Sequence, residues 1–553
     1  MIYGIVRFVA LALGLFTLLA GWPFPAPELR AQPLRLTGSF SLYSEAYTQR
    51  GLQLNRRPGQ QIGIQGQITL TVAGQMSFPF SFFLSTEERG YQLPFNQLGF
   101  NPRWRWIQTH LGYFSTQLSE WTLRDARIRG VGMELAPGPL RLAFVRGITQ
   151  RASAADTLRH LPPVLERMLT AIQVGLGKKD GWHLWLTGLH ARDTPNELAY
   201  TSFDVTPQNN LVVSASVGIV PLSRHLRLKG EVAASIYTPD TWADSLTLGS
   251  SLARLRQRLE PLITLRLGSR VDGAASASLF FQPFSAFQLN LEGRYVGPGF
   301  RSLGAIQLET DILDVLIAPR IRVRWLQLSG RFGLRRNNLA NSRARTRRRT
   351  LTAVNVHLSP GRAFSLMGEY TNFGVRLERR LDTLTVSHIS HLLGLSPILS
   401  WGASHNRHTL SLSYRLQESN EYYIAFQRAR QTRNRDVVLS HTVTFGSGHS
   451  LTSTGTYTST AFDTLRTTIL NWNESITLQI GRARATLSIG LVRTTTQVTD
   501  IGLRGRLNLS LPISTGGQLQ FRFHLRTYRY GQPRVHATGY TEGTVYLGYN
   551  HQF

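Results

Sequence analysis

The sequence of 553 residues contains no cysteine and has only 32 acidic residues against 61 basic ones. The absence of cysteine excludes disulfide cross-links and cysteine-ligated metal centres. The shortage of Asp and Glu leaves a formal net charge of +29. Lysine occurs only at Lys178, Lys179 and Lys229, so 58 of the 61 basic residues are arginine. Arginine suits phosphate and carboxylate, but codon composition is an equally open cause of this bias.

Long apolar runs are missing as well. Beyond residue 31, no segment approaches the roughly 18 continuous apolar residues of a membrane-spanning helix. The apolar stretch from Phe8 to Ala20 is too short for such a helix, follows the early basic residue Arg7, and precedes the small residue Ala31. This layout predicts a secretory signal peptide over residues 1–31. We therefore expect an exported mature chain, residues 32–553, that forms a single domain.

Motifs for catalysis and cofactor binding are also lacking. The chain has no Walker-type loop, no His-Glu-x-x-His and no Gly-x-Ser-x-Gly in a strand-to-helix context. His388 and His391 are three residues apart in a predicted strand, which puts them on opposite faces. We expect no enzyme activity, no catalytic, cofactor-binding or metal residues, and no cofactor. An exported chain without a recognition helix is not expected to bind nucleic acid.

What the chain does have is two-residue alternation along almost its whole length. In 61–72, isoleucines and Leu70 alternate with Gln and Thr, and the same pattern recurs in 226–236, 501–511 and 518–526. One face of each such strand suits lipid. The other carries Arg, Gln, Thr and Ser, which makes it too polar for the core of a β-sandwich. The pattern predicts a transmembrane β-barrel with a wet lumen.

Turn-forming residues divide this alternation at regular intervals. Short turn signals, rich in Gly and Pro, occur at 73–75, 101–103, 137–139, 178–181, 221–224, 282–285, 318–320, 359–362, 404–407, 447–449, 481–483 and 514–517. The clearest of the longer, polar connections between them are 49–60, 114–129, 151–168, 192–208, 238–260, 335–348 and 417–436.

Twelve turns and thirteen longer connections separate 26 strands, and the loss of one hairpin near 92–100 or 318–320 would leave 24. We therefore predict an all-β fold, a closed antiparallel barrel of about 24–26 strands with short periplasmic turns and longer outer loops. Two connections could hold short helices, over Leu158 to Leu169 and Ser245 to Leu259. Each could be a lid or a plug, although a plain surface loop is the favoured interpretation.

Arginine clusters are the one chemically biased feature. An arginine that faces lipid at the membrane midplane costs about 2–4 kcal/mol, so strand arginines should face the lumen; the predicted set is Arg227, Arg266, Arg270, Arg504, Arg506, Arg522 and Arg526. A second set crowds one predicted outer loop, and consists of Arg335, Arg336, Arg343, Arg345, Arg347, Arg348 and Arg349. The clusters predict an anion-favouring lumen or loops that bind lipopolysaccharide phosphates, and a solvated face partly balanced by acidic residues is the alternative.

Two segments resemble known outer-membrane barrels. The last strand, 544–553, alternates apolar residues and ends on Phe553, which resembles the signal read by the barrel-assembly machinery. The segments 295–304 and 335–339 resemble porin-like barrels of Bacteroidota-type bacteria, which lack a separate plug domain. The resemblance implies a Gram-negative outer-membrane location, with the membrane and its lipopolysaccharide as surroundings.

A closed barrel of this size has a lumen that its own wall side chains cannot fill. Loops fold inward, or the barrel is flattened, or a protein partner occupies the lumen. We expect a channel for solutes, and the excess of arginine favours anionic ones. The alternative is a scaffold subunit of a secretion or surface-assembly complex.

Overall fold

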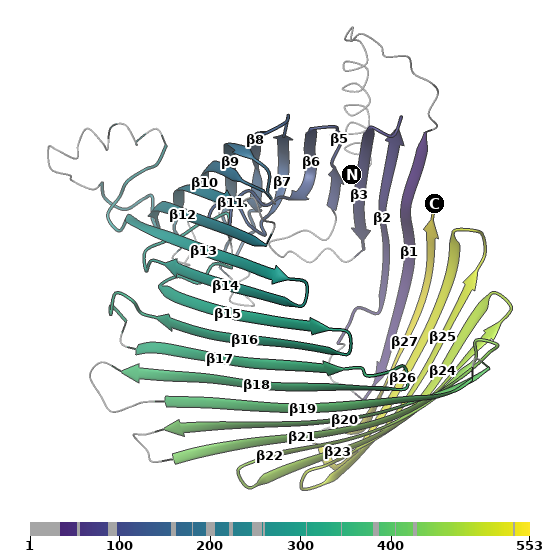
Figure 1. Ribbon diagram of the computed structural model, residues 1–553. Helices are drawn as coiled ribbons and strands as arrows, with labels where there is room; N and C mark the ends of the chain where they lie inside the picture. The colour runs from purple at the N-terminus through teal and green to yellow at the C-terminus, as the bar shows by residue number, and fades with distance from the viewer. Residues whose placement is uncertain are drawn as a thin grey trace.

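The computed structural model describes residues 34–51, 56–86, 97–155, 162–179, 181–194, 205–220, 225–245, 257, 260, 262–305, 307–343, 345–379, 386–403, 405–423, 428–534 and 537–553. The expected signal peptide at 1–31 lies outside these residues, as do the predicted turn at 221–224 and most of the possible helix over 245–259. All named secondary-structure elements within the described residues are β-strands (Figure 1).

The first half of the chain contributes shorter strands. They are β1 Arg35–Arg50, β2 Gln60–Val72, β3 Met76–Ser85, β4 Gln97–Phe100, β5 Arg103–Trp104, β6 Ile107–Ser115, β7 Arg127–Leu135, β8 Leu140–Gln150, β9 Glu166–Gly177, β10 His183–Thr194, β11 Asn209–Ile219, β12 Leu226–Thr238, β13 Arg270–Phe284 and β14 Phe287–Val296.

The second half contributes strands of up to 18 residues. They are β15 Ile312–Val323, β16 Leu326–Asn337, β17 Arg345–Leu358, β18 Phe364–Arg379, β19 Val386–Ala403, β20 Asn406–Tyr423, β21 Arg428–Phe445, β22 Ser450–Phe462, β23 Leu465–Ile480, β24 Ala483–Thr495, β25 Thr499–Pro512, β26 Gly517–Arg534 and β27 Ala537–Gln552.

The strands close into a barrel. Each pairs antiparallel with its neighbours in sequence, and the last strand pairs with the first, with Tyr43 opposite Gly548. β4 and β5 both pair with β3 and β6, so they share one position and the 27 labelled strands fill 26 positions. Closure leaves no open sheet edge, as a barrel in lipid requires. The predicted closed antiparallel barrel of 24–26 strands is confirmed.

The outer face of the barrel is apolar. Successive side chains of a strand point to opposite faces. In β10, Leu184 and Leu186 are 52% and 56% exposed, whereas Trp185 and Thr187 beside them are 8% and 2% exposed. Apolar side chains exposed in this way over a whole barrel surface suit lipid rather than water. Within the described part of the chain, no helix has the length and apolarity needed to cross a membrane.

Connections differ between the two ends of the barrel. The start of β1 and the end of β27 lie together, because the Gly38 amide donates to the Phe553 carbonyl at 2.9 Å. Turns at this end are short, and exposed tryptophans such as Trp182 and Trp325 flank them. Longer connections lie at the opposite end, although those after β22 and β24 span only 463–464 and 496–498. The predicted asymmetry therefore holds best in the first half of the chain.

Two predicted turns are wrong. Pro319 lies within β15, where it pairs with Leu289 of β14 but interrupts the pairing with β16, so its missing N–H costs one local ladder contact. The chain reverses instead at 324–325. Pro102 separates β4 from β5, and the reversal follows at Arg105, which has a positive φ of 50°.

Three longer segments also differ from expectation. Residues 166–169 of the possible helix over 158–169 belong to β9. The predicted loop at 417–436 is mostly strand and that at 335–348 is half strand, because β16, β17, β20 and β21 extend beyond the roughly 9–11 residues that a span requires. Their arginines, except Arg343 in the connection 338–344, therefore lie on the barrel wall rather than in loops.

Candidate functional site in the barrel lumen

Two connections fold into the lumen and pack against its wall. Residues 116–126 follow β6 and residues 297–311 follow β14; together we call them the lumen plug, of which Ile306 lies outside the described residues. Trp121, Leu123 and Phe300 are fully buried in one apolar cluster with inward-facing side chains of the wall. The wall contribution comes from Phe114, Ile128, Ala143, Val145, Leu169, Ala171, Leu189, Ala191, Val212, Ala233, Ala274, Val296 and Ile312.

This cluster corrects the expectation that the inner face is polar throughout. In β8, Ala143 and Val145 face inward and are buried, whereas Phe144 between them faces outward and is 38% exposed. Strands β7 to β12 thus carry apolar side chains on both faces. The sequence signal for this arrangement is a run such as 142–145, in which every residue is apolar. Such a run indicates a strand with apolar surroundings on both faces.

Polar contacts hold the first plug segment against the wall. The Ser119 hydroxyl donates to the Glu231 carboxylate of β12, which is 3% exposed. The Gln173 amide of β9 donates to the Leu118 carbonyl at 2.7 Å. Buried polar groups cost free energy unless they are paired, so these wall residues have their partners in the plug.

A charged cluster surrounds Glu120 of the same segment. Its carboxylate lies 3.1 Å from the Arg294 guanidinium and accepts a hydrogen bond from Ser276 at 3.0 Å. The Arg294 guanidinium also lies over the Trp121 ring, 5.1 Å from its centre. Strands β13 and β14 are thereby joined to the plug as well.

The second plug segment joins the first. The Ser302 hydroxyl donates to the Thr122 carbonyl at 2.7 Å, and the rings of Trp121 and Phe300 meet edge to face at 6.1 Å. At its start, the Gly299 amide donates to Asp272 at 2.7 Å. A Cβ on Gly297 would meet the same carboxylate at 2.0 Å, so a larger residue here would displace the Asp272 side chain from the Gly299 amide.

Three of the seven predicted outer-loop arginines form ion pairs with this plug. Arg335 lies 2.7 Å from Glu309, Arg347 lies 3.2 Å from Glu309, and Arg343 lies 3.1 Å from Asp311. Only Arg343 is in the connection 338–344. The others lie on strands, Arg335 and Arg336 on β16, and Arg345, Arg347, Arg348 and Arg349 on β17. Sequence proximity suggested a loop cluster, but strand pairing distributes these side chains over two faces.

The predicted lumen-facing arginines fall into two groups. Arg504, Arg506, Arg522 and Arg526 lie on one face of β25 and β26, opposite to the exposed Leu503, Leu509 and Leu525. Arg227 and Arg270 share the inward register of β12 and β13 with Ala233 and Ala274. Arg266 is not on a strand; it lies in the connection 239–269, where it donates to the Thr241 carbonyl at 3.1 Å.

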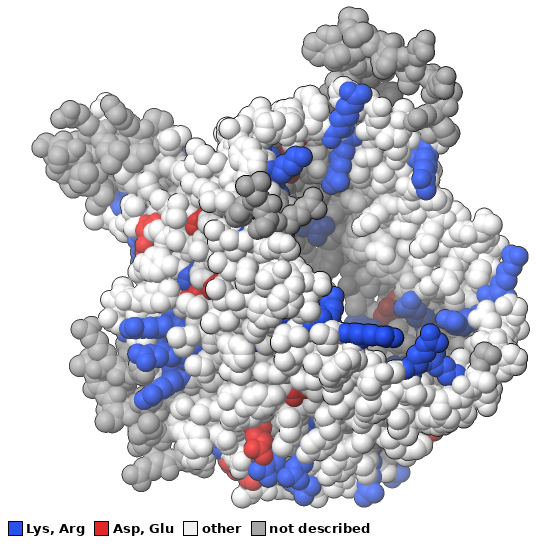
Figure 2. Space-filling model, in the orientation of Figure 1, with Lys and Arg blue, Asp and Glu red and all other residues white. Residues whose placement is uncertain are grey.

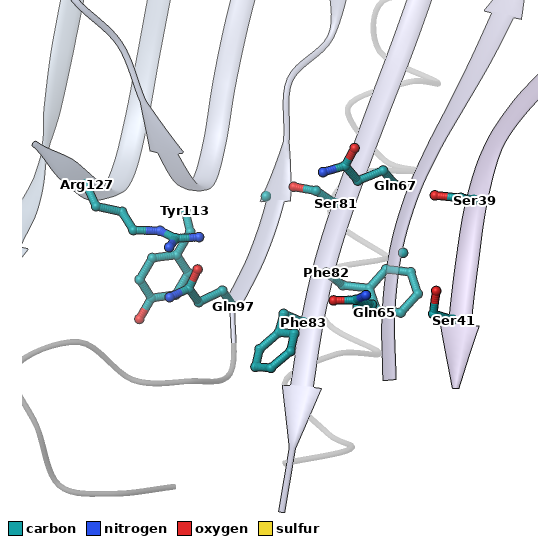
Figure 3. Close-up of a pocket in the computed structure, with 12 residues that line it drawn as sticks. Ser39, Ser41, Gln65, Gln67, Ser81, Phe82, Phe83, Gln97, Tyr113 and Arg127 are labelled. Atoms are coloured by element: carbon teal, nitrogen blue, oxygen red, sulfur yellow. The ribbon is translucent and has the colours of Figure 1, made fainter. Parts of the chain in front are cut away.

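The wall beside β25 to β27 continues into an amide-rich pocket. Gln65, Gln67 and Gln97, with Ser39, Ser41 and Ser81, line a cavity of about 400 Å³ that Tyr113 and Arg127 face from β6 and β7 (Figure 3). Figure 2 shows a hollow in this side of the molecule with basic side chains along its edge. Within the described residues, no group of three or more His, Asp and Glu side chains could hold a metal ion.

No protein-family model matches the chain, and no curated protein matches it. Solved structures include the FrpB iron transporter from Neisseria meningitidis, with 11% identity, a TM-score of 0.38 and coverage of 94% of this chain and 82% of that chain. OccAB2 from Acinetobacter baumannii has 10% identity, a TM-score of 0.31 and coverage of 63% and 92%. The anion-selective porin from Comamonas acidovorans has 13% identity, a TM-score of 0.29 and coverage of 52% and 93%.

Proposed function

We propose that this chain is a channel of the Gram-negative outer membrane that passes small solutes and favours anions. Its closed barrel presents an apolar exterior to its surroundings, and such an exterior is stable only in lipid. Barrels with short turns at the end of their termini and longer connections opposite are typical of that membrane. The resemblance to Bacteroidota-type barrels stays a prediction.

One observation carries the channel proposal: the lumen is divided. The plug packs on the inner wall from β7 to β15, where apolar and paired polar groups leave little for a solute to bind. The inner wall of β25 to β27 and β1 instead presents Arg504, Arg506, Arg522 and Arg526 with tyrosines and glutamines. A solute path along that wall meets positive charge, which attracts anions and repels cations.

Planar-bilayer recording of the purified protein tests the proposal. Under a KCl gradient we expect steady single-channel currents. Their reversal potential should lie closer to the equilibrium potential of chloride than to that of potassium. The double variant Arg504→Gln with Arg506→Gln should move the reversal potential toward zero. A protein that forms no channel, or one that prefers potassium, would contradict the proposal.

The alternative of a scaffold for a secretion complex ranks second. The lumen plug occupies space that a polypeptide partner would need, and its contacts join β9, β12, β13, β14 and β16. A partner that co-purifies in gentle detergent and displaces the plug, seen as lost protection of 116–126 from hydrogen exchange, would favour the scaffold instead.

We also propose that the end of the barrel opposite the termini faces lipopolysaccharide. Arg336, Arg348 and Arg376 are direct cross-strand neighbours on the lipid side of β16, β17 and β18, just beyond the exposed Leu334 and Phe332. Basic side chains gather over these strand ends (Figure 2). Arginine rows at the edge of an apolar belt suit lipid phosphates. Mass spectrometry should find bound lipopolysaccharide on the purified protein, and less of it when all three arginines are replaced by Gln.

A further inference from the structure

Three rows of polar side chains cross the inner wall of β25, β26, β27 and β1. In the first row, Arg504 is opposite Arg526, which is opposite Glu542. The second row, one step nearer the termini, places Arg506 opposite His524 and Thr544, and the third places Asn508 opposite Arg522 and Tyr546. Side chains opposite each other on one face are about 4.5–5.5 Å apart at Cβ. Four arginines therefore share one small area near the middle of two strands.

The acidic side chains of this area have partners. Glu542 lies 3.6 Å from both Arg56 and Arg526, and Glu45 lies 3.0 Å from Arg57. Asp500 accepts hydrogen bonds from the Tyr528 hydroxyl at 3.2 Å and from the Gly531 amide at 2.9 Å.

The basic side chains of this area outnumber its acidic side chains. Among the described residues, no carboxylate pairs with Arg504, Arg506 or Arg522. Like charges directly opposite each other destabilise a sheet. The row of Arg504 and Arg526 therefore has a net attraction for an anion from the lumen.

Aromatic rings hold two of the guanidinium groups in place. Arg526 lies 5.6 Å from the Tyr540 ring centre and 5.8 Å from that of Tyr528, and Arg522 lies 4.8 Å from that of Tyr546. Such cation–π contacts use the flat face of the guanidinium and leave its N–H edge free. The Nε atom of Arg526 is buried and has no hydrogen-bond partner. Arg526 also pairs with Glu542 at 3.6 Å, and Arg522 donates to the Gln520 side-chain carbonyl at 2.7 Å, so these contacts orient both guanidinium groups. Arg504 and Arg506, which pair with no carboxylate among the described residues, supply the positive charge that a bound oxyanion would neutralise.

We infer that this arginine patch, formed by Arg504, Arg506, Arg522 and Arg526, binds the phosphate group of a small solute on its way through the lumen. A phosphate offers several oxygens and up to two negative charges, and guanidinium forks bind it in pairs of parallel hydrogen bonds. Carboxylates offer one charge and two oxygens, so they should bind more weakly. The inference rests on the proposed channel for its transport role but not for the binding itself. Free phosphate and a phosphate monoester share this chemistry.

The experiment uses the purified full barrel and two readouts. Chloride current through single channels is titrated with inorganic phosphate or glucose 6-phosphate, with acetate and glucose as comparison solutes. Isothermal calorimetry with the same solutes measures binding without any current. We expect both phosphate compounds to block chloride current and to release or absorb binding heat, and acetate and glucose to do neither at the same concentrations. Block by only one phosphate compound would identify whether free phosphate or a monoester is the cargo.

The matched variants lie on neighbouring strands, β25 and β26, but on opposite faces of the wall. Arg504→Gln with Arg506→Gln removes two donors of the patch, and should raise the half-blocking phosphate concentration by about tenfold or more, since one charge-assisted contact contributes about 1.5–3 kcal/mol. Arg529→Gln lies on β26 but faces lipid beside Ile501, and should leave the block unchanged.

The outcomes separate the two proposals. If chloride current is present but phosphate neither blocks it nor produces binding heat, the phosphate site is overturned and the channel proposal stands. The same holds if the Arg529→Gln control loses as much phosphate block as the double variant. If the barrel conducts no current but binds phosphate, and the Arg504→Gln, Arg506→Gln variant loses the binding heat, the site is supported and the channel proposal is overturned.

Discussion

The Glu231 carboxylate, on the inner face of β12, accepts a hydrogen bond from the Ser119 hydroxyl of the lumen plug. Glu231 is 3% exposed and Ser119 is 6% exposed, so the carboxylate depends on the plug for its hydrogen bonds. The backbone amide of Glu120 approaches the same carboxylate at 3.4 Å. Because an unpaired buried charge is costly, the wall stabilises the inward position of the plug and the plug stabilises the wall.

Replacement of Glu231 by alanine should loosen the plug. The loss of hydrogen bonds to a charged group costs about 1.5–3 kcal/mol, and most of the 26-position barrel should remain folded because its strand pairing is untouched. We expect faster hydrogen exchange of the 116–126 amides and noisier, larger single-channel currents. The Glu231→Gln variant keeps an acceptor for Ser119 and should show a smaller effect; equal effects of the two substitutions would contradict this role for the contact.

Trp121 should be the main apolar anchor of the plug. Its side chain is fully buried against Phe300 and beneath Arg294, and a Trp→Ala change of this kind costs about 3–5 kcal/mol. Trp121→Ala should therefore increase mean conductance and open 116–126 to proteases. Trp325→Ala, at an exposed turn position (53% exposed), is the control and should change neither. An unchanged conductance in Trp121→Ala would show that the plug does not limit current.

The two faces of a strand should differ sharply in their tolerance of charge. Leu503 faces outward and is 52% exposed, whereas Thr486 of the neighbouring β24 lies in the inward row with Asn508. Leu503→Arg should cost about 2–4 kcal/mol in a bilayer and reduce folding into lipid vesicles, as measured by heat-dependent gel migration. Thr486→Arg should fold normally; the reverse ranking would mean that the faces are assigned wrongly.

Phe553 should matter for delivery and for closure of the barrel. Its carbonyl accepts from the Gly38 amide at 2.9 Å, and its amide donates to the Gly38 carbonyl at 3.2 Å, which extends the β1–β27 pairing by one residue. Deletion of Phe553 should lower the folded fraction recovered from outer membranes, and Gln552→Ala should not. If the deletion protein also folds poorly in lipid vesicles without assembly factors, the defect lies in closure; if it folds well there, the defect lies in recognition.

Strand number and closure were predictable because they depend on short-range patterns. The alternation in 501–511 and 518–526 gives each strand a lipid side, and Gly or Pro turns such as 137–139 and 359–362 mark reversals. Errors occurred where the same residue types have two roles. The sequence pattern predicts a turn at Pro319, but this residue lies within β15, where it interrupts the pairing with β16. The charge of the arginines of 345–349 predicts a loop, but they belong to β17.

The sequence by itself determined a closed antiparallel barrel of 24–26 strands, an apolar exterior, an excess of arginine and no known catalytic motif, because period-two alternation and composition are local properties. Only the tertiary structure decided that residues 116–126 and 297–311 meet inside the lumen, that Glu231 and Gln173 are paired there, and that Arg504 and Arg526 stand side by side. These relationships join segments far apart in the chain, and they depend on register and on the shape of the inner wall, which no local pattern encodes.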